Sequence, residues 1–165
     1  MRGCSVWSLD PALEKLIADL GWRVRVNPQN PAEMIIGDYA RGFLILGREH
    51  DVQVARRSVR GEPSLKMWTP DVLAAQKYVA FFAARLLRFR RGLADVVVPV
   101  DPATIADPFV DESAHPLQTK LTWEDGWAEF GAGNAFAAVQ FSHYGRGSVA
   151  DTIAYVLGAD QSHKI

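Results

Sequence analysis

The sequence of residues 69–92 is TPDVLAAQKYVAFFAARLLRFRRG, and it predicts the longest helix of the chain. Thr69 can cap this helix, Pro70 fits its first position, and Asp71 favours the positive end of the helix dipole. Gly92 marks its end. Because the apolar stripe of this helix is wide, we expect burial on more than one side. The stripe has helical spacing and consists of Val72, Ala75, Val79, Phe82, Leu86 and Phe89, widened by Tyr78, Phe81 and Leu87.

The segment before this helix predicts a short helix and an antiparallel meander. Asp10 and Pro11 open a helix over residues 11–20, and Gly21 ends it. Alternating apolar residues and closely spaced turns then indicate half-buried strands. Five strands are expected, at Trp22–Val26, Met34–Ile36, Phe43–Leu46, Val52–Ala55 and Leu65–Trp68.

The segment after the long helix is less regular. Residues 93–100 predict a strand or an extended connector, and Pro99 disfavours a central strand. Residues 101–116 predict a long loop or a short helix with loops. A hairpin, a turn, a further strand and a helix capped by Ser148 follow. They are expected at Leu117–Trp123 with Trp127–Phe130, at Gly131–Asn134, at Phe136–Phe141 and through about Leu157. The tail at 159–165 is expected to be frayed.

Strands and helices are grouped rather than strictly alternating, which favours an α+β fold. We expect an antiparallel sheet of about six to eight strands. A long central helix and N- and C-terminal helices should pack on it. The length of 165 residues suits a single domain, with a core over about residues 9–158.

Charge is unevenly distributed along the chain. The formal net charge is -1, but residues 1–91 carry +6 and residues 92–165 carry -7. Such halves either compensate each other inside the fold or form a dipolar surface that steers a charged partner. Because the whole chain has no excess of basic residues, no nucleic-acid partner is expected.

Targeting and membrane signals are weak. The apolar runs are far shorter than the roughly 18–20 residues that a membrane span needs, and the N-terminus lacks the apolar region of a signal peptide. The single cysteine, Cys4, cannot form an internal disulfide. We therefore expect a cytoplasmic protein without a membrane partner.

Motifs for catalysis, cofactors and metals are also weak. The Gly131–Gly133 pair lacks the third glycine of a dinucleotide loop and precedes a strand pattern instead of a helix. Ser142 and His143 are adjacent, so their side chains would point apart on a strand. The four histidines are scattered and lack the spacing of metal ligands. We expect no catalytic residue, no cofactor and no metal.

The order of elements and several short motifs resemble a family of actinobacterial immunity proteins that includes the antitoxin of the tuberculosis necrotizing toxin. The resemblance covers about residues 9–158 and rests on apolar patterns and helix punctuation. Its motifs are Leu20-Gly21-Trp22, Gly42–Leu46, Thr69–Leu73, Arg88–Leu93, Trp123–Trp127, Ala137–Ser142 and Val149–Leu157.

The resemblance implies a noncatalytic cytosolic protein that binds a secreted toxin domain with NAD glycohydrolase activity and blocks its active site. No inhibitory residue of the family maps onto this sequence, so we infer the contact residues from their chemistry. Two segments combine acidic and aromatic side chains, as specific protein interfaces do. They are Asp107, Phe109, Asp111 and Glu112 in the long loop, and Trp123, Glu124, Asp125 and Trp127 at the hairpin turn. The basic side of the long helix is a third candidate.

Two other classes of function stay open. An adaptor or secretion-chaperone-like domain would bind extended segments of a partner and dimerise through an apolar face. A small enzyme would need a deep pocket that holds His50, His115 or His143 beside a carboxylate. If the protein is an immunity protein, we expect it to be a monomer or a weak dimer when no toxin is bound.

Overall fold

The computed structural model describes residues 8–113, 119–131 and 135–158. Some expectations therefore lie outside the described residues. They are the frayed tail at 159–165, the turn residues Ala132–Asn134, the first residues of the hairpin at 117–118, and the side chains of Cys4, His115 and His163.

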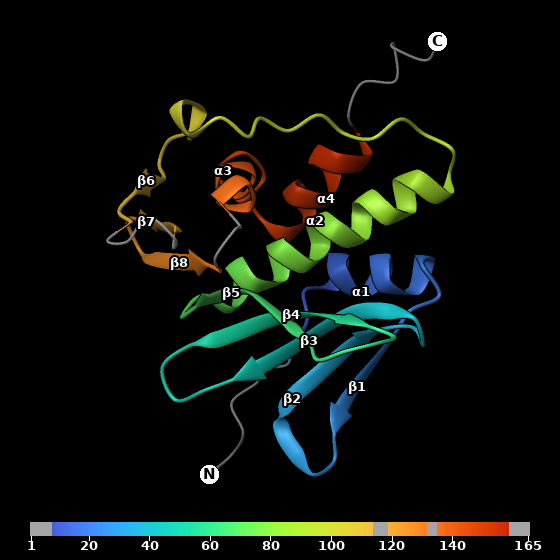
Figure 1. Ribbon diagram of the computed structural model, residues 1–165. Coiled ribbons are helices and arrows are strands. Elements are labelled where there is room, and N and C mark those ends of the chain that lie inside the picture. The colour runs from blue at the N-terminus through green and yellow to red at the C-terminus, as the bar shows by residue number, and fades with distance from the viewer. Residues whose placement is uncertain (1–7, 114–118, 132–134, 159–165) are drawn as a thin grey trace.

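The described residues form three layers, which confirms the expected α+β fold (Figure 1). An antiparallel sheet is the first layer. Helices α1 (Pro11–Asp19) and α2 (Val72–Arg90) form the second layer, and helix α4 (Val149–Leu157) lies on the far side of α2. Helix α3 (Ala135–Tyr144) packs against α2 and against the last strands of the sheet. None of the described helices is long and apolar enough to cross a membrane.

The sheet contains eight strands within the described part of the chain, and the five expected meander strands are confirmed. The C-terminal hairpin extends the sheet from the fifth strand, where Met67 lies opposite Phe130 and Trp68 lies opposite Glu129. The order is β1 (Arg23–Asn27), β2 (Asn30–Gly37), β3 (Arg41–Gly47), β4 (Val52–Ser58), β5 (Ser64–Thr69), β8 (Gly126–Phe130), β7 (Thr119–Trp123) and β6 (Val110–Asp111).

Most helix caps follow the sequence prediction, but the cap of α2 does not. The Asp10 carboxylate accepts from the Ala12 amide, and Ser148 with Asp151 forms the predicted capping box of α4. At α2 the capping residue is Asp71, not Thr69. Thr69 ends β5 instead, and its hydroxyl donates to the Trp127 carbonyl at 2.7 Å. The Thr69 side chain thus joins β5 to β8.

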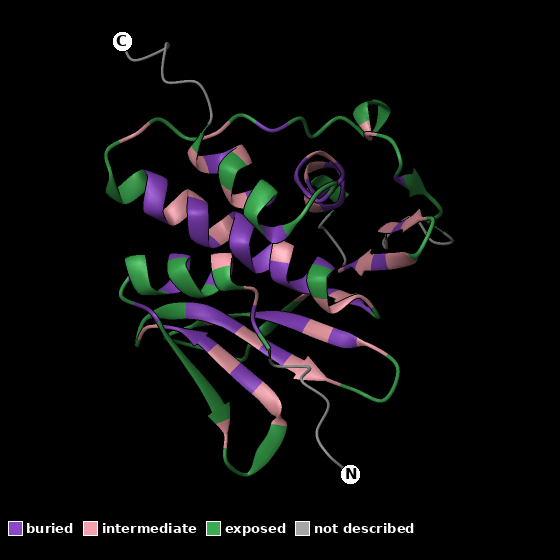
Figure 2. Ribbon diagram, turned by 180° about the vertical axis from the view of Figure 1, so that it is seen from behind, coloured by how far each residue is buried: buried purple, intermediate pink, exposed green. Residues whose placement is uncertain are grey.

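Helix α2 is buried on two sides, as the wide apolar stripe predicts (Figure 2). Toward the sheet, the Tyr78 ring meets Phe43 edge-on with ring centroids 6.3 Å apart. On the other side, the Phe81 ring stacks on Tyr144 at 3.9 Å. The small buried residues Ala80, Ala83 and Ala84 let neighbouring elements approach the helix closely.

The strand predicted at Phe136–Phe141 is wrong, because this segment belongs to helix α3. The segment is apolar on most positions, so its periodicity does not separate a strand from a buried helix. Its alanines favour the helix. Phe141 is buried against Phe130, with ring centroids 5.7 Å apart. The Gly131–Gly133 pair therefore comes before a helix in the sequence, and Ser142 and His143 lie on that helix.

Two glycines face each other where β2 and β3 meet. Gly37 has φ +154° and lies opposite Gly42, which has φ +148°. A Cβ on Gly42 would lie 2.1 Å from the Ile36 carbonyl oxygen. Glycine is therefore required at this close approach of the two backbones.

We predict that Gly42→Ala destabilises the protein by about 2–4 kcal/mol, because both the backbone conformation and the contact with β2 are strained. Thermal unfolding should then show a melting temperature lower by about 5–15 °C. Gly61→Ala is the matched control, since Gly61 also has positive φ but nothing lies within 4 Å of its added Cβ. If Gly42→Ala and Gly61→Ala lost the same amount of stability, the close approach of β2 and β3 would not be what requires glycine.

Candidate functional site

The structure brings the two predicted contact segments together at one end of the sheet. Strand β6 of the long loop pairs with β7, with Val110 opposite Thr122 and Asp111 opposite Leu121. The hairpin turn that joins β7 to β8 lies beside it. We call the exposed carboxylates of this region the acidic end: Asp107, Asp111, Glu112, Glu124 and Asp125.

The aromatic residues of the two segments support this end from different sides. Phe109 is 6% exposed, and its ring meets Trp123 edge-on at 5.2 Å. Trp123 also contacts Phe141 of α3, with ring centroids 6.2 Å apart. Trp127 lies opposite Thr122 and so on the other face of the hairpin, where the Lys120 ammonium is 4.8 Å from its ring centroid. Phe109 is thus part of the core, while Trp123 and Trp127 are half-buried.

A buried hydroxyl fixes the acidic loop to helix α3. The Ser142 hydroxyl donates to the Val139 carbonyl at 2.6 Å and accepts from the Ala106 amide at 3.1 Å. The next turn of the loop is closed by a Phe109 amide that donates to the Ala106 carbonyl at 3.0 Å. This role of Ser142 was not predictable from the strand pattern expected for its segment, because the residue lies on helix α3.

The hairpin turn presents two carboxylates at its tip. Trp123 lies opposite Gly126, so Glu124 and Asp125 alone connect the strands. A Cβ on Gly126 would lie 3.2 Å from the Trp123 ring, so a glycine lets the ring cover the turn. Between residues 101 and 130 the sequence contains one Lys and no Arg, and the acidic end therefore has a strongly negative potential.

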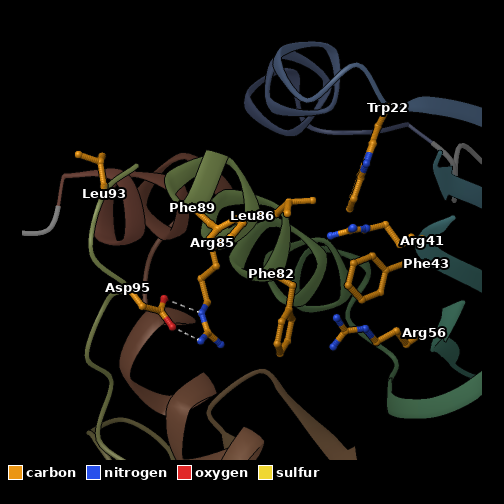
Figure 3. A pocket seen from close by; sticks show the side chains of 11 residues that line it. Trp22, Arg41, Phe43, Arg56, Phe82, Arg85, Leu86, Phe89, Leu93 and Asp95 are labelled. Carbon is orange, nitrogen blue, oxygen red and sulfur yellow. Dashed lines mark hydrogen bonds and ion pairs between the residues drawn. The ribbon is translucent and has the colours of Figure 1, made fainter. Parts of the chain in front are cut away.

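A pocket of about 390 Å³ lies at a different place, between α2 and strands β3 and β4 (Figure 3). Its walls include the rings of Trp22, Phe43 and Phe82. In Figure 3, Arg41 and Arg56 reach from the strands toward Phe82 of the helix. The basic side of the long helix, a third candidate in the sequence, contributes Arg85 to this pocket.

One of the three arginines of the pocket is neutralised. Arg85 donates to both oxygens of Asp95, at 3.1 and 2.5 Å. This hydrogen bonding lowers the pKa of the Asp95 carboxyl against a smaller opposing effect of burial. Arg56 lies 5.8 Å from the ring centroid of Phe82. Within the described residues, neither Arg41 nor Arg56 has a carboxylate within ion-pair distance, so the pocket carries excess positive charge.

The histidines considered for an enzyme lie apart. His50 is in an exposed turn beside Glu49, whereas His143 lines a hollow of about 450 Å³ that also contains Asp151. The Asp151 carboxylate accepts from the Ser148 amide at 2.8 Å within the cap of α4. The described residues contain no group of three or more His, Cys, Asp and Glu that could hold a metal.

The described residues thus form an α+β fold with an exposed acidic end and a separate pocket lined by arginines and aromatic rings. The chain belongs to the Immunity protein 61 family, whose model matches residues 18–160. It is therefore an immunity protein, as the sequence resemblance indicates, and its family implies a protein toxin as partner and a role as a noncatalytic inhibitor.

A solved structure has a similar fold. It is Rv3902c from M. tuberculosis, with a TM-score of 0.71 and 15% sequence identity. The match covers 89% of this chain and 88% of that chain. No curated protein matches the chain.

The ion pair at the pocket gives a pH-dependent prediction. Asp95→Asn should lower the free energy of unfolding by less than about 1 kcal/mol at neutral pH, because the pair is largely exposed. The pKa of Asp95 is lowered in the folded protein, so its contribution is present above 3.8 and is lost as the pH falls through the lowered pKa. Urea unfolding of both proteins across this range measures the difference. If the difference in unfolding free energy between the two proteins grew as the pH falls, Asp95 would not be stabilised as a carboxylate by Arg85.

Proposed function

We propose that this protein is an antitoxin that binds a secreted toxin domain of the NAD glycohydrolase type and blocks its active site. Membership of the Immunity protein 61 family supports a protein toxin as the partner. The resemblance noted in the sequence supports the NAD glycohydrolase type. The observation that carries the active-site assignment is the acidic end, where separate segments meet in one exposed, negatively charged surface.

Charge complementarity connects this surface to such a toxin. NAD has a negatively charged pyrophosphate, so a cleft that binds it offers cations or amide donors to that group. The carboxylates of the acidic end would bind the same cations or amide donors of the toxin cleft. Glu124 and Asp125 at the tip of a two-residue turn are well placed to enter a cleft.

The support beneath the acidic end favours tight binding. Phe109 and Trp123 pack against Phe141, and Ser142 holds the loop backbone to α3. A surface that is already ordered loses less conformational entropy when it binds. We therefore propose that Phe109 acts by shaping the loop.

The proposed contact region keeps the eight residues inferred from the sequence, seven of them as contacts and Phe109 as the buried support of the loop. Its carboxylates would set specificity and association rate, and its two half-buried tryptophans would supply apolar contact area. The region consists of Asp107, Phe109, Asp111, Glu112, Trp123, Glu124, Asp125 and Trp127.

The function is tested by NAD hydrolysis. Candidate toxin domains from the same genome are assayed with and without stoichiometric amounts of the protein. We expect complete inhibition at a ratio of one to one and a stable complex of the same stoichiometry. Binding without inhibition would overturn active-site blocking. A dimer that binds no candidate toxin would favour the adaptor class.

The acidic end is tested by charge reversal. The double variant Glu124→Lys/Asp125→Lys should inhibit the toxin roughly 10- to 100-fold less well, because like charges placed opposite each other repel. This loss corresponds to about 1.4–2.8 kcal/mol of binding free energy. Glu49→Lys/Glu62→Lys is the matched control, since these two carboxylates lie in exposed turns of the meander. Equal inhibition by both double variants would exclude the hairpin tip from the interface.

A further inference from the structure

The arginine-lined pocket lies away from the acidic end. The acidic end adjoins the start of α2, where Thr69 bonds to Trp127. The pocket instead lies along the C-terminal half of α2, which contributes Phe82, Arg85 and Phe89 (Figure 3). The two surfaces are thus separate and can be tested separately.

The pocket is lined by residues that share one face of the strands and by residues that share one face of helix α2. Arg41 and Phe43 are two residues apart on β3 and share a face, and Arg56 of β4 lies opposite Phe43. On α2, Phe82 and Phe89 are seven residues apart and share a face of the helix. Aromatic rings from both sides therefore form the walls, and guanidinium groups from the strands lie at the mouth.

The burial of these residues gives the pocket an apolar floor and a cationic rim. Phe43 is 3% exposed and Trp22 is 7% exposed, so both belong to the floor. Arg41 and Arg56 are exposed, and no described carboxylate lies within ion-pair distance of either guanidinium group, although Asp38 interacts with Arg41 at longer range. A ligand that fills this site combines a large apolar group with negative charges beside it.

We propose that the pocket binds an acidic segment of a partner protein, in which a large apolar side chain lies between carboxylates. The apolar side chain packs against Phe43 and Phe82. The flanking carboxylates bind Arg41 and Arg56. A pocket of about 390 Å³ has room for one aromatic side chain and part of its backbone.

Exposed aromatic residues in and near the pocket wall favour a protein segment over a small molecule. Phe89 is 77% exposed at the pocket wall. Tyr39 is 90% exposed in the turn before β3, and an Asp38–Arg90 contact of 3.9 Å holds this turn near the end of α2. A chain segment extends beyond the pocket and so covers the exposed part of Phe89 at its wall, whereas a small molecule inside the pocket leaves that part exposed. Tyr, Phe and Arg are typical of protein interfaces.

The test uses the free protein and a synthetic probe, so its result does not depend on the proposed toxin. The probe is a fluorescein-labelled peptide, Glu-Asp-Phe-Asp-Glu, and fluorescence polarisation measures its dissociation constant. We expect binding that weakens as salt rises, and at least tenfold weaker binding of a peptide with Ser in place of Phe. The proposal would be overturned if the Phe and Ser peptides bound with equal affinity, or if neither peptide bound.

Protein variants locate the site. Arg41→Glu and Arg56→Glu should each weaken peptide binding at least tenfold, and Arg56→Lys should retain more affinity than Arg56→Glu. Arg25→Glu is the matched control, because Arg25 is exposed on β1 opposite Ile35, on the sheet face turned away from α2. Circular dichroism and thermal unfolding confirm that each variant folds. Equal affinity of Arg25→Glu and the pocket variants would overturn the site.

A small-molecule arm distinguishes the source of the ligand. Phenylacetate offers one ring and one carboxylate without a peptide chain. It should displace the labelled peptide only at concentrations at least tenfold above those of the unlabelled peptide. Equal potency would assign the pocket to a small aromatic anion and overturn the protein-segment proposal.

Discussion

The burial of helix α2 on two sides is the constraint on which the rest of the structure depends. A helix between a sheet and other helices must present small or apolar residues over most of its surface. The alanines Ala80, Ala83 and Ala84 meet this requirement without separating the layers. Arg88 is the charged exception: it is 3% exposed and donates to the Ala94 and Val156 carbonyls, which ties the end of α2 to the connector and to α4.

A fixed central helix keeps the two charged regions of the molecule apart. Five acidic residues of the C-terminal half lie on β6 and in the loops beside β6 and β7, whereas the pocket arginines come from the N-terminal half. Among the ion pairs of the described residues, Arg85–Asp95 is the one that joins the two halves. Opposite charges that are not paired inside the fold remain available for partners, which suits an immunity protein.

The candidate site was partly predictable. Acidic and aromatic residues close in sequence identified the two segments, because composition is a local property. The pairing of β6 with β7 was not predictable, since a two-residue strand has no periodicity. The burial of Phe109 also depends on a distant residue, Phe141, whose helix was mistaken for a strand. The pocket was missed because its residues come from five separate segments.

The sequence by itself determined the meander, the long helix and the caps at Asp10 and Ser148, because alternation, helical spacing and capping involve neighbouring residues. Only the tertiary structure decided between Thr69 and Asp71 as the cap of α2, since the Thr69 hydroxyl is used by a strand 58 residues away. It also decided that α3 is a helix and which charged residues share a surface. These features depend on packing between segments that are distant in the sequence, and local sequence patterns do not encode that packing.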